Sequence, residues 1–326
     1  MIDNDNKIIK VRVPGSVMLT GEHAVLRGHL AVVAAVDRYI NLQLLPNDSA
    51  NIHIEADGIG SWFAPLQDLR VEKPFQFVLT VLKRYQAHFK KGFDIVIQSD
   101  FSSQLGLGSS AAVTVATLLA VRRYLQLDAD SKAIFIEARE VIREVQGMGS
   151  GADVAASVYG GVVAYRADPL EIKQLSSLLP LSLVYSGKKV ATPIVVNQVN
   201  AWADENAELS EKIFTAIGEC SAQASRAIQL KNWQLLGEIF SVQQALMREL
   251  HLSNDVLDEI IETANTIPHV FGAKISGSGL GDCVVVVGKV PDGYFPINEL
   301  QERQGVEMIN IGLSEQSKQV VLNETC

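Results

Sequence analysis

Residues 104–112, Gln-Leu-Gly-Leu-Gly-Ser-Ser-Ala-Ala, combine glycine with serine and run directly into an apolar stretch of helical character. Gly106 and Gly108 allow the backbone to turn so that its amides face inward, and Ser109 or Ser110 can cap the helix that follows. The start of a helix carries roughly half a positive charge together with free N–H groups, so a di- or triphosphate fits there. A serine hydroxyl at this point can also reach a phosphate-bound Mg²⁺ ion.

Two better-known phosphate motifs do not describe this segment. It is not a Walker A loop, because no lysine followed by serine or threonine stands after its glycines. It is not a dinucleotide fingerprint either, because its pattern is Gly-x-Gly-Ser-Ser and the preceding residues, 99–104, make a poor turn out of a parallel strand. An ordinary strand–turn–helix explains the same residues, so the segment alone leaves phosphate binding and a structural turn both open.

Asp153 ends a second glycine-rich loop, Gly-Met-Gly-Ser-Gly-Ala-Asp, at residues 147–153. An aspartate near the start of a helix is usually a cap or a partner of the helix dipole. A carboxylate held at the end of a flexible glycine loop is also what a general base requires. Taken alone, Asp153 is better explained as a cap or a dipole partner, and a catalytic role depends on what the chain places beside it.

Two further segments bring glycines and polar residues together. Residues 14–25 carry Glu22 and His23 behind glycine turns, and an exposed Glu–His pair on a β-hairpin is the simpler explanation for them. Residues 272–283, Gly-Ala-Lys-Ile-Ser-Gly-Ser-Gly-Leu-Gly-Asp-Cys, join two apolar strands with three glycines in five residues, more than a hairpin requires. The alternatives there are a long hairpin and a second backbone clamp on phosphate.

Hydrophobic periodicity predicts the elements that position these groups. Strands are expected at residues 8–13, ending at Pro14 and Gly15, and at 31–45, 52–56, 93–97, 160–165, 181–185, 273–276, 283–287 and 306–311. Helices are expected at residues 74–90, 109–125, 131–146, 200–230, 233–250 and 254–266. Strands dominate the first half and helices the second, which predicts an α+β protein with two domains, residues 1–175 and 176–326.

Composition and charge limit the class of protein. The 326 residues suit two domains that share a cleft, and 48% hydrophobic against 20% charged residues can form a sizeable core. A formal net charge of −9 without a basic block argues against nucleic acid and anionic membranes as partners. No apolar run approaches the roughly 20 residues that span a bilayer. The polar N-terminal residues do not resemble a secretory signal and the three cysteines form no CxxC pair, so we expect a cytoplasmic protein without disulfides or zinc.

Taken together and in this order, the four segments resemble the motifs of the GHMP kinase family. Residues 14–28 resemble its first motif, 104–112 its ATP-binding second motif and 272–283 its glycine-rich third, while Gly-Ser-Gly-Ala-Asp resembles the loop that carries the catalytic aspartate. The resemblance extends over most of the chain. It implies a two-domain fold, in which an N-terminal ATP-binding domain resembles domain 2 of ribosomal protein S5 and the C-terminal domain is ferredoxin-like.

The resemblance also implies the reaction and the residues that carry it. The γ-phosphoryl group of ATP, with Mg²⁺, would pass to an alcohol, a reaction that depends on positioning and charge neutralisation. Asp153 would accept or orient the proton of the acceptor hydroxyl, and Ser110 would bind Mg²⁺. The ATP-binding residues would be Leu105, Gly106, Leu107, Gly108, Ser109, Ser110 and Ala111.

Two positions depart from the family pattern. Ser16 stands where the first motif usually has a lysine that assists the aspartate, and Lys188 is our candidate for the replacement cation. The usual Mg²⁺-binding glutamate upstream of the aspartate falls on Ile142. Glu140 and Glu144 lie nearby, and Glu144 is our predicted carboxylate ligand of the metal.

Resemblances to two kinds of family member bear on the acceptor. Gly-Glu-His-Ala-Val resembles members that act on mevalonate, which implies phosphorylation of the 5-hydroxyl of (R)-mevalonate. The family resemblance also implies a homodimer. The implied substrate-binding residues are Glu22, His23, Ser150, Thr192, Gly277 and Ser278. Residues 188–192 also resemble the stretch that brings a threonine to the active site in members that act on mevalonate. Residues 149–165 and 185–192, and the ending Gly-Asp-Cys of the third motif, resemble members that act on phosphomevalonate. A catalytically weak metabolite-binding protein of the same fold is a further alternative, because the motif lysine is missing.

Overall fold

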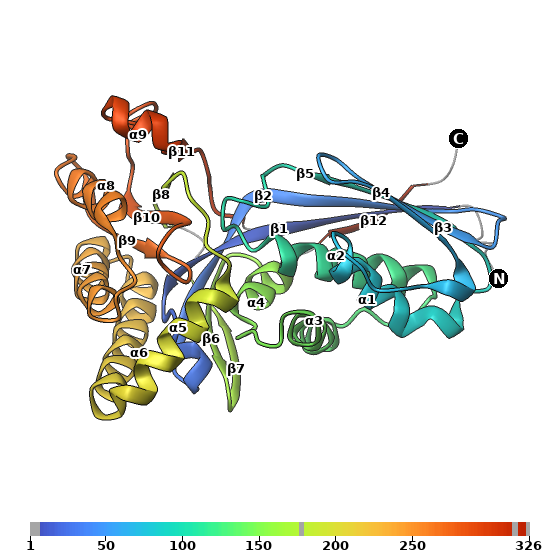
Figure 1. Ribbon diagram of the computed structural model, residues 1–326, viewed down its shortest axis with the longest axis horizontal. Helices are drawn as coiled ribbons and strands as arrows, with labels where there is room; N and C mark the ends of the chain where they lie inside the picture. Colours follow the sequence, from blue (N-terminus) through green and yellow to red (C-terminus); the bar gives the residue numbers. More distant parts are fainter. Residues whose placement is uncertain (1–6, 176–178, 315–318, 324–326) are drawn as a thin grey trace.

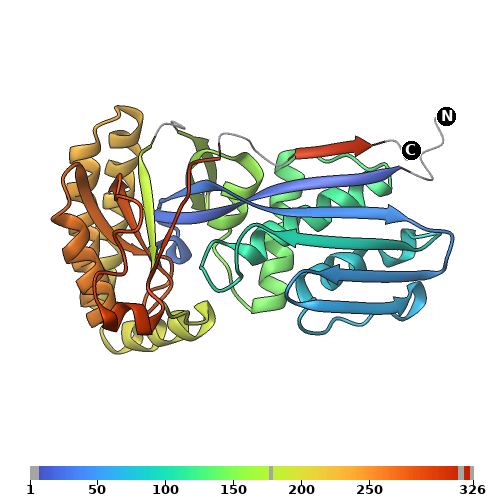
Figure 2. The same ribbon diagram turned by 90° about the horizontal axis from the view of Figure 1, so that it is seen from above.

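The computed structural model describes residues 7–175, 179–314 and 319–323, which form two halves, each built on its own sheet (Figure 1). The two longest strands, β1 (Ile8–Thr20) and β2 (Ala31–Pro46), pair antiparallel and extend from the first half toward the second (Figure 2). The short 3₁₀ helix η1 (Ala24–Arg27) connects them, and it contacts helix α6 of the second half. The chain that follows β1 therefore lies where the two halves meet.

The first sheet has eight strands, in the order β12-β1-β2-β5-β3-β4, with β6 paired to β2 and β7 paired to β6. All neighbouring pairs are antiparallel except β3 and β5, which are parallel. Its other strands are β3 (Asn51–Ala56), β4 (Gly60–Pro65), β5 (Phe93–Ser99), β6 (Val162–Ala167), β7 (Leu170–Gln174) and β12 (Gln319–Asn323). Helices cover one face of this sheet (Figure 1), namely α1 (Gln76–Tyr85), α2 (Ser109–Tyr124), α3 (Ser131–Gln146) and α4 (Ala152–Tyr159). Two 3₁₀ turns, η2 (Leu66–Asp68) and η3 (Gln86–His88), flank α1.

Helix α2 is the central element of the first half. It contacts strands β1 and β2 on one side and helices α1, α3 and α4 on the others. Its sequence is apolar nearly all round, as expected for a helix that is covered on every side, and most of its residues are buried. The N-terminus of α2 is consequently held in a fixed position relative to β1.

The second sheet has four antiparallel strands in the order β11-β8-β10-β9. They are β8 (Leu181–Tyr185), β9 (Val270–Ser276), β10 (Cys283–Gly288) and β11 (Glu307–Ile309). Helical segments lie between β8 and β9 and between β10 and β11, namely α5 (Thr192–Glu205), α6 (Ala207–Gln229), α7 (Trp233–Glu249), α8 (Asp255–Asn265) and α9 (Glu299–Gln304). This order of strands and helices is the split β-α-β arrangement, so the ferredoxin-like prediction for the second half is confirmed. None of the described helices is long and apolar enough to cross a bilayer.

The structure differs from the periodicity prediction at two places that bear on the site. Strand β1 does not end at Pro14 and Gly15, because its pairing with β2 shifts register there and then continues to Thr20. A bulge tolerates a proline, which has no N–H group to donate. The predicted helix 200–230 is two helices that meet at Asn206, and the first of them already begins at Thr192.

Several short elements were not predicted. Periodicity did not indicate strands β4, β7 and β12 or the eight-residue helix α4, and the helix expected at residues 74–90 is only Gln76–Tyr85. Strand β12 comes from the C-terminal end of the chain yet pairs with β1 in the first sheet. Its partner lies about 300 positions away in the sequence, so no local pattern could indicate the pairing.

A close approach of backbone fixes helix α7 on strand β9. A Cβ atom added to Gly237 in α7 would lie 1.9 Å from the carbonyl oxygen of Phe271, and one added to Gly272 would lie 2.5 Å from the carbonyl oxygen of Gly237. The two glycines therefore allow helix and strand to touch through their main chains. Because β9 leads into the loop with Gly277 and Ser278, this contact helps to set the position of that loop.

We expect Gly237→Ala to lower the free energy of unfolding by about 1–3 kcal/mol, because main-chain atoms would have to move. The matched control is Gly218→Ala in α6, where the three nearest atoms to an added Cβ belong to the side chain of His29, which can rotate away. Alanine favours both helices by about 1 kcal/mol over glycine, so that term cancels in the comparison. Denaturant unfolding measures the difference, and a loss for Gly237→Ala no larger than for Gly218→Ala would contradict the prediction.

Candidate active site

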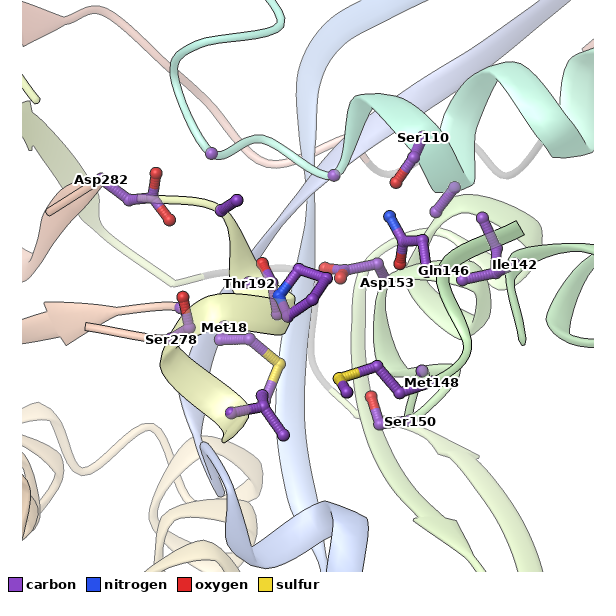
Figure 3. A pocket seen from close by; sticks show the side chains of 18 of the residues that line it. Met18, Ser110, Ile142, Gln146, Met148, Ser150, Asp153, Thr192, Ser278 and Asp282 are labelled. Atoms are coloured by element: carbon purple, nitrogen blue, oxygen red, sulfur yellow. The ribbon is translucent and has the colours of Figure 1, made fainter. Parts of the chain in front are cut away.

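A cleft of about 520 Å³ lies where the two halves meet. Its walls come from the chain after β1, the loop before α2, the end of α3, the loop before α4, the start of α5 and the loop between β9 and β10 (Figure 3). All four glycine-bearing segments that the sequence singled out therefore contribute to one site. The cleft is lined by both polar and apolar side chains, as is typical of a small-molecule site.

The glycine-rich loop before α2 forms one wall. Gly106 and Gly108 have φ values of +70° and +63°, the left-handed conformation that favours glycine. Gly108 is the N-cap residue of α2 and no side chain caps the helix, so the prediction that Ser109 or Ser110 is the cap is wrong. The hydroxyl-bearing Ser109 and Ser110 instead begin the helix and line the cleft.

The predicted ATP-binding residues are not equivalent in the structure. Gly106, Gly108 and Ala111 line the cleft together with the two serines. Leu107 is buried in the core, and its carbonyl oxygen accepts a hydrogen bond of 3.0 Å from the amide of Ser16. Leu105 packs against the same core, and its carbonyl oxygen accepts a hydrogen bond from the thiol of Cys283. The two leucines thus fix the loop, and the residues between and after them face the cleft.

Asp153 stands opposite this loop, in the first turn of α4. Gly151 is the N-cap residue, so Asp153 is not the helix cap that its position alone suggested. Its Oδ1 atom accepts a hydrogen bond of 2.8 Å from Ser16 Oγ. Burial raises the pKa of Asp153, and the hydrogen bond from Ser16 and the charge of Lys189 oppose that rise.

The hydrogen bond between Ser16 and Asp153 is possible because Gly108 has no side chain. A Cβ atom added there would lie 2.2 Å from Ser16 Oγ and 3.4 Å from Asp153 Oδ1. Strand β1, the loop before α2 and the start of α4 therefore converge at a point that only glycine can occupy. The convergence brings a carboxylate next to the start of a helix whose free amides favour phosphate.

The cation in the cleft is Lys189. It lines the cleft, its Nζ atom donates a hydrogen bond of 2.6 Å to the carbonyl oxygen of Ser103, and its charge lowers the pKa of Asp153. The structure does not bring the predicted Lys188 into the lining; its carbonyl oxygen accepts a hydrogen bond from the amide of Asp282. Neighbouring side chains in an extended segment point to opposite sides, and the sequence did not reveal which of the two lysines faces inward.

The structure places Glu144 outside the cleft. Its carboxylate forms an ion pair of 2.7 Å with Arg84, which also pairs with Glu140. Ile142 and Gln146, four residues apart on one face of α3, are the residues of that helix that line the cleft. Among the described residues, no group of three or more histidine, cysteine, aspartate or glutamate side chains is arranged to bind a metal ion by itself.

Glu22 and His23 line the cleft but are not an exposed pair on a hairpin, because both are buried. The Glu22 carboxylate forms an ion pair of 2.6 Å with Lys274 and also accepts a hydrogen bond from the amide of Gln243. His23 Nε2 lies 2.8 Å from the carbonyl oxygen of Ser278, and burial lowers the pKa of His23. Because a carbonyl can only accept, Nε2 carries the proton of the neutral ring and Nδ1 is left as an acceptor.

Ser150, Thr192, Gly277 and Ser278 also line the cleft, so the structure brings all six predicted substrate-binding residues together. Three buried polar atoms at the cleft have no partner within the described protein, namely His23 Nδ1, Ser278 Oγ and Asp282 Oδ1. Buried polar atoms normally have partners, and those left without one point to a ligand.

Asp282 is the site residue that the sequence reasoning missed. It lies in the loop between β9 and β10, lines the cleft and has a φ of +61°, unusual for a residue other than glycine. Burial raises its pKa to about 6, the charge of Lys189 opposes the rise, and the charge of Asp153 adds to it. A carboxylate directly after a run of glycines was the available signal, since a loop that only turns does not require it.

Comparisons with known proteins agree with this arrangement. Residues 76–161 match the family model of the GHMP kinases N terminal domain, and residues 224–292 match that of the GHMP kinases C terminal. A mevalonate kinase of Pyrococcus horikoshii is 32% identical over 85% of this chain and 88% of its own, and one of Archaeoglobus fulgidus is 30% identical over 90% and 98%. The solved structure of Methanococcus jannaschii mevalonate kinase has the same fold, with a TM-score of 0.76, 24% identity, and coverage of 95% of this chain and 99% of that one.

The two-sheet fold, the cleft between its halves and these matches together define the class: the chain belongs to the GHMP kinase family. It is accordingly a kinase-type phosphotransferase, and the relatives from Pyrococcus horikoshii and Archaeoglobus fulgidus that it matches along most of its length are mevalonate kinases.

We expect Ser16→Ala to move the acidic limb of the kcat/KM profile to higher pH. The Ser16 hydrogen bond lowers the pKa of Asp153, so its loss raises that pKa further, and the carboxylate form then appears only at higher pH. A hydrogen bond to a charged group contributes about 1.5–3 kcal/mol, which corresponds to a shift of about 1–2 pH units. Ser157→Ala is the control, because Ser157 donates a buried hydrogen bond to the carbonyl oxygen of Pro14 instead. An acidic limb that stays in place in Ser16→Ala would disprove the coupling.

Proposed function

We propose that the protein transfers the γ-phosphoryl group of MgATP to the 5-hydroxyl of (R)-mevalonate, giving 5-phosphomevalonate. The observation that carries the proposal is the position of Asp153, between a phosphate-binding loop on one side and a pocket for a small acceptor on the other. Figure 3 places Asp153 between Ser110 and the group formed by Met18, Met148 and Ser150. The relatives named mevalonate kinase supply the identity of the acceptor.

ATP would bind with its phosphates against the loop before α2. The amides around Gly106 and Gly108 and the positive end of the α2 dipole favour negative charge there. Ser109 and Ser110 offer hydroxyl groups that no cap interaction occupies. Lys189, held at the edge of the loop by its hydrogen bond to Ser103, adds a positive charge.

Asp153 would accept or orient the proton of the acceptor hydroxyl. Its buried position raises its pKa, which makes it a stronger base than an exposed aspartate. The hydrogen bond from Ser16 favours the carboxylate form and fixes the direction of the side chain. In this role Ser16 replaces the lysine of the family pattern with a neutral donor.

Mg²⁺ fits the donor set at the nucleotide end of the cleft. The hydroxyl of Ser110 and the unpartnered carboxylate oxygen of Asp282 are oxygen donors of the type that Mg²⁺ prefers, and nucleotide phosphates commonly complete such a site. When bound, the ion supplies positive charge that balances the phosphates. Glu144 remains a prediction that the observed ion pair with Arg84 does not favour.

The acceptor end of the cleft favours mevalonate over phosphomevalonate. It is lined by Met18, Val25, Leu26, Met148 and the neutral His23, which suit a small branched hydroxy acid. Among the described residues that line the whole cleft, Lys189 is the only lysine or arginine, and it belongs to the nucleotide end. The phosphate group of phosphomevalonate would therefore have no lysine or arginine side chain to bind at this end of the cleft. The start of α5, where Thr192 stands, can favour the single carboxylate of mevalonate.

A homodimer, which rests on the family resemblance, and a cytoplasmic location, which rests on the sequence composition, complete the proposal. Size-exclusion chromatography with light scattering determines the first, and fractionation of the native cells determines the second.

We expect Asp153→Asn to reduce kcat by about 10²–10⁴-fold, the usual contribution of a general base. The affinity for ATP should stay nearly unchanged, because asparagine keeps the shape and the contact with Ser16. Steady-state kinetics and calorimetric titration with ATP measure the two quantities separately. Loss of ATP binding with an intact fold would make Asp153 a structural residue, contrary to the proposal.

The acceptor is tested with mevalonate and 5-phosphomevalonate in one coupled assay of ADP release. An uncompensated buried charge costs about 3–5 kcal/mol, so we expect kcat/KM to be at least roughly 100-fold higher with mevalonate. Equal or better turnover of phosphomevalonate would reverse the assignment. ATP binding without phosphorylation of either acceptor would instead support a metabolite-binding protein.

A further inference from the structure

The carboxylate of Asp282 occupies an unusual position between two glycine-rich loops. An atom added at the Cβ position of Gly106 would lie 3.0 Å from Asp282 Cγ, and one added at Gly277 would lie 3.5 Å from Asp282 Oδ2. The residue is 6% exposed, and its Oδ1 atom is buried without a partner in the described part of the chain. Figure 3 shows the Asp282 carboxylate close to the loop before α2, with its two oxygens pointing to different sides.

Two main-chain hydrogen bonds to the segment 186–188 hold Asp282 in place. Its amide donates a hydrogen bond of 2.7 Å to the carbonyl oxygen of Lys188, and its own carbonyl oxygen accepts one of 2.9 Å from Ser186. Its φ of +61° is one that aspartate and asparagine tolerate better than most other residues. The carboxylate is therefore positioned by the backbone and not by a side-chain partner, which leaves its oxygens available to a ligand.

The charge of the cleft requires a cation near this carboxylate. Glu22, Asp153 and Asp282 line the cleft, while Lys189 is the only lysine or arginine among its described lining residues. Lys274 neutralises Glu22, so two carboxylates face a single lysine. A triphosphate bound at Gly106 would add several negative charges beside Asp282, and like charges at such range repel strongly unless a positive ion lies between them.

We propose that Asp282, in the loop between β9 and β10, would be a carboxylate ligand of the divalent cation that enters with the nucleotide. This inference rests on the proposed binding of ATP in the cleft and goes beyond it by assigning the metal ligand. Mg²⁺ sites of nucleotide enzymes commonly use one or two carboxylates and complete their coordination with phosphates and water, so one buried carboxylate suffices here. Asp153 is the poorer candidate, because Ser16 already donates to its Oδ1 atom.

Asp282 thereby offers a carboxylate to a cleft that lacks the usual one, from the side opposite Ile142 (Figure 3). Ile142 stands in place of the expected glutamate on α3 and lines the cleft with an apolar side chain. Glu144 is turned away and paired with Arg84. The metal-binding carboxylate has accordingly moved from the first half of the molecule to the second, so that binding of the metal–nucleotide complex links the two halves.

The decisive variant is Asp282→Asn, which removes the charge, keeps the size and tolerates the same positive φ. Mn²⁺ is titrated calorimetrically into the protein saturated with a non-hydrolysable ATP analogue, without any acceptor. We expect the apparent affinity for Mn²⁺ to fall at least about 10–100-fold, the range seen when a residue that supports a metal ligand is removed. Binding of the metal-free analogue should stay the same or become tighter, because a repelling charge is gone.

Two further variants complete the experiment. Asp57→Asn removes an exposed carboxylate in the turn between β3 and β4 and should leave the Mn²⁺ affinity unchanged. Glu144→Gln tests the rival carboxylate on α3. An unchanged Mn²⁺ affinity in Asp282→Asn, or a loss confined to Glu144→Gln, would overturn the proposal. Because no acceptor is present, an error in the identity of the acceptor does not affect this result, whereas failure of the wild-type protein to bind the analogue would refute the nucleotide site itself.

Discussion

The junction between the two halves depends on a buried ion pair, Glu22 with Lys274 at 2.6 Å. The glutamate follows β1 in the first half and the lysine lies in β9 of the second, and neither side chain is appreciably exposed. Gln243 in α7 adds a hydrogen bond to the same carboxylate and accepts one from the amide of Gly21. Every wall of the cleft is positioned by the elements that this junction connects.

The same stretch of chain makes two more bonds to the second half. His23 is hydrogen bonded to the carbonyl oxygen of Ser278, and Ser276 donates a hydrogen bond of 2.9 Å to the carbonyl oxygen of Met18. A buried ion pair gives little net stability, because desolvation offsets most of the attraction, but breaking one partner costs about 3–5 kcal/mol. Its effect here is thus to specify one arrangement of the halves. The acceptor pocket and the loop with Ser278 and Asp282 both depend on that arrangement of the halves.

The local chemistry of the site could be predicted from the sequence, but its long-range geometry could not. The glycine-rich loop before α2 and the position of Asp153 follow from short motifs, because glycine conformation and helix starts are local properties. Neither the meeting of Ser16 with Asp153 nor the pairing of β12 with β1 is local, since each joins residues far apart in the chain. Their partners are set by the packing of α2 and α4 on the sheet, which periodicity does not encode.

Two misjudged positions show a finer limit of sequence reasoning. Lys188 and Lys189 are adjacent, and the side of an extended segment that faces a cleft depends on hydrogen bonds such as the one from Lys189 to Ser103. On α3, Glu144 is charged and close in number to the expected ligand, but a step of two residues in a helix points about 200° away. The direction in which a side chain points from its helix therefore indicates a site residue better than residue type or closeness in sequence number. Ile142 points toward the cleft, whereas Glu144 pairs with Arg84 outside it.

The replacement of a lysine by Ser16 changes the electrostatic balance of the whole cleft. A lysine beside Asp153 would hold its pKa down and contribute one of the charges that a triphosphate needs. Ser16 gives only a neutral hydrogen bond, so burial dominates and the pKa of Asp153 rises. Lys189 is the only lysine or arginine in the described lining, and its charge lowers the pKa of both Asp153 and Asp282. If ATP binds as proposed, positive charge arrives with the nucleotide, and the binding of its cation and the basicity of Asp153 are then coupled through Lys189, whose charge acts on both carboxylates.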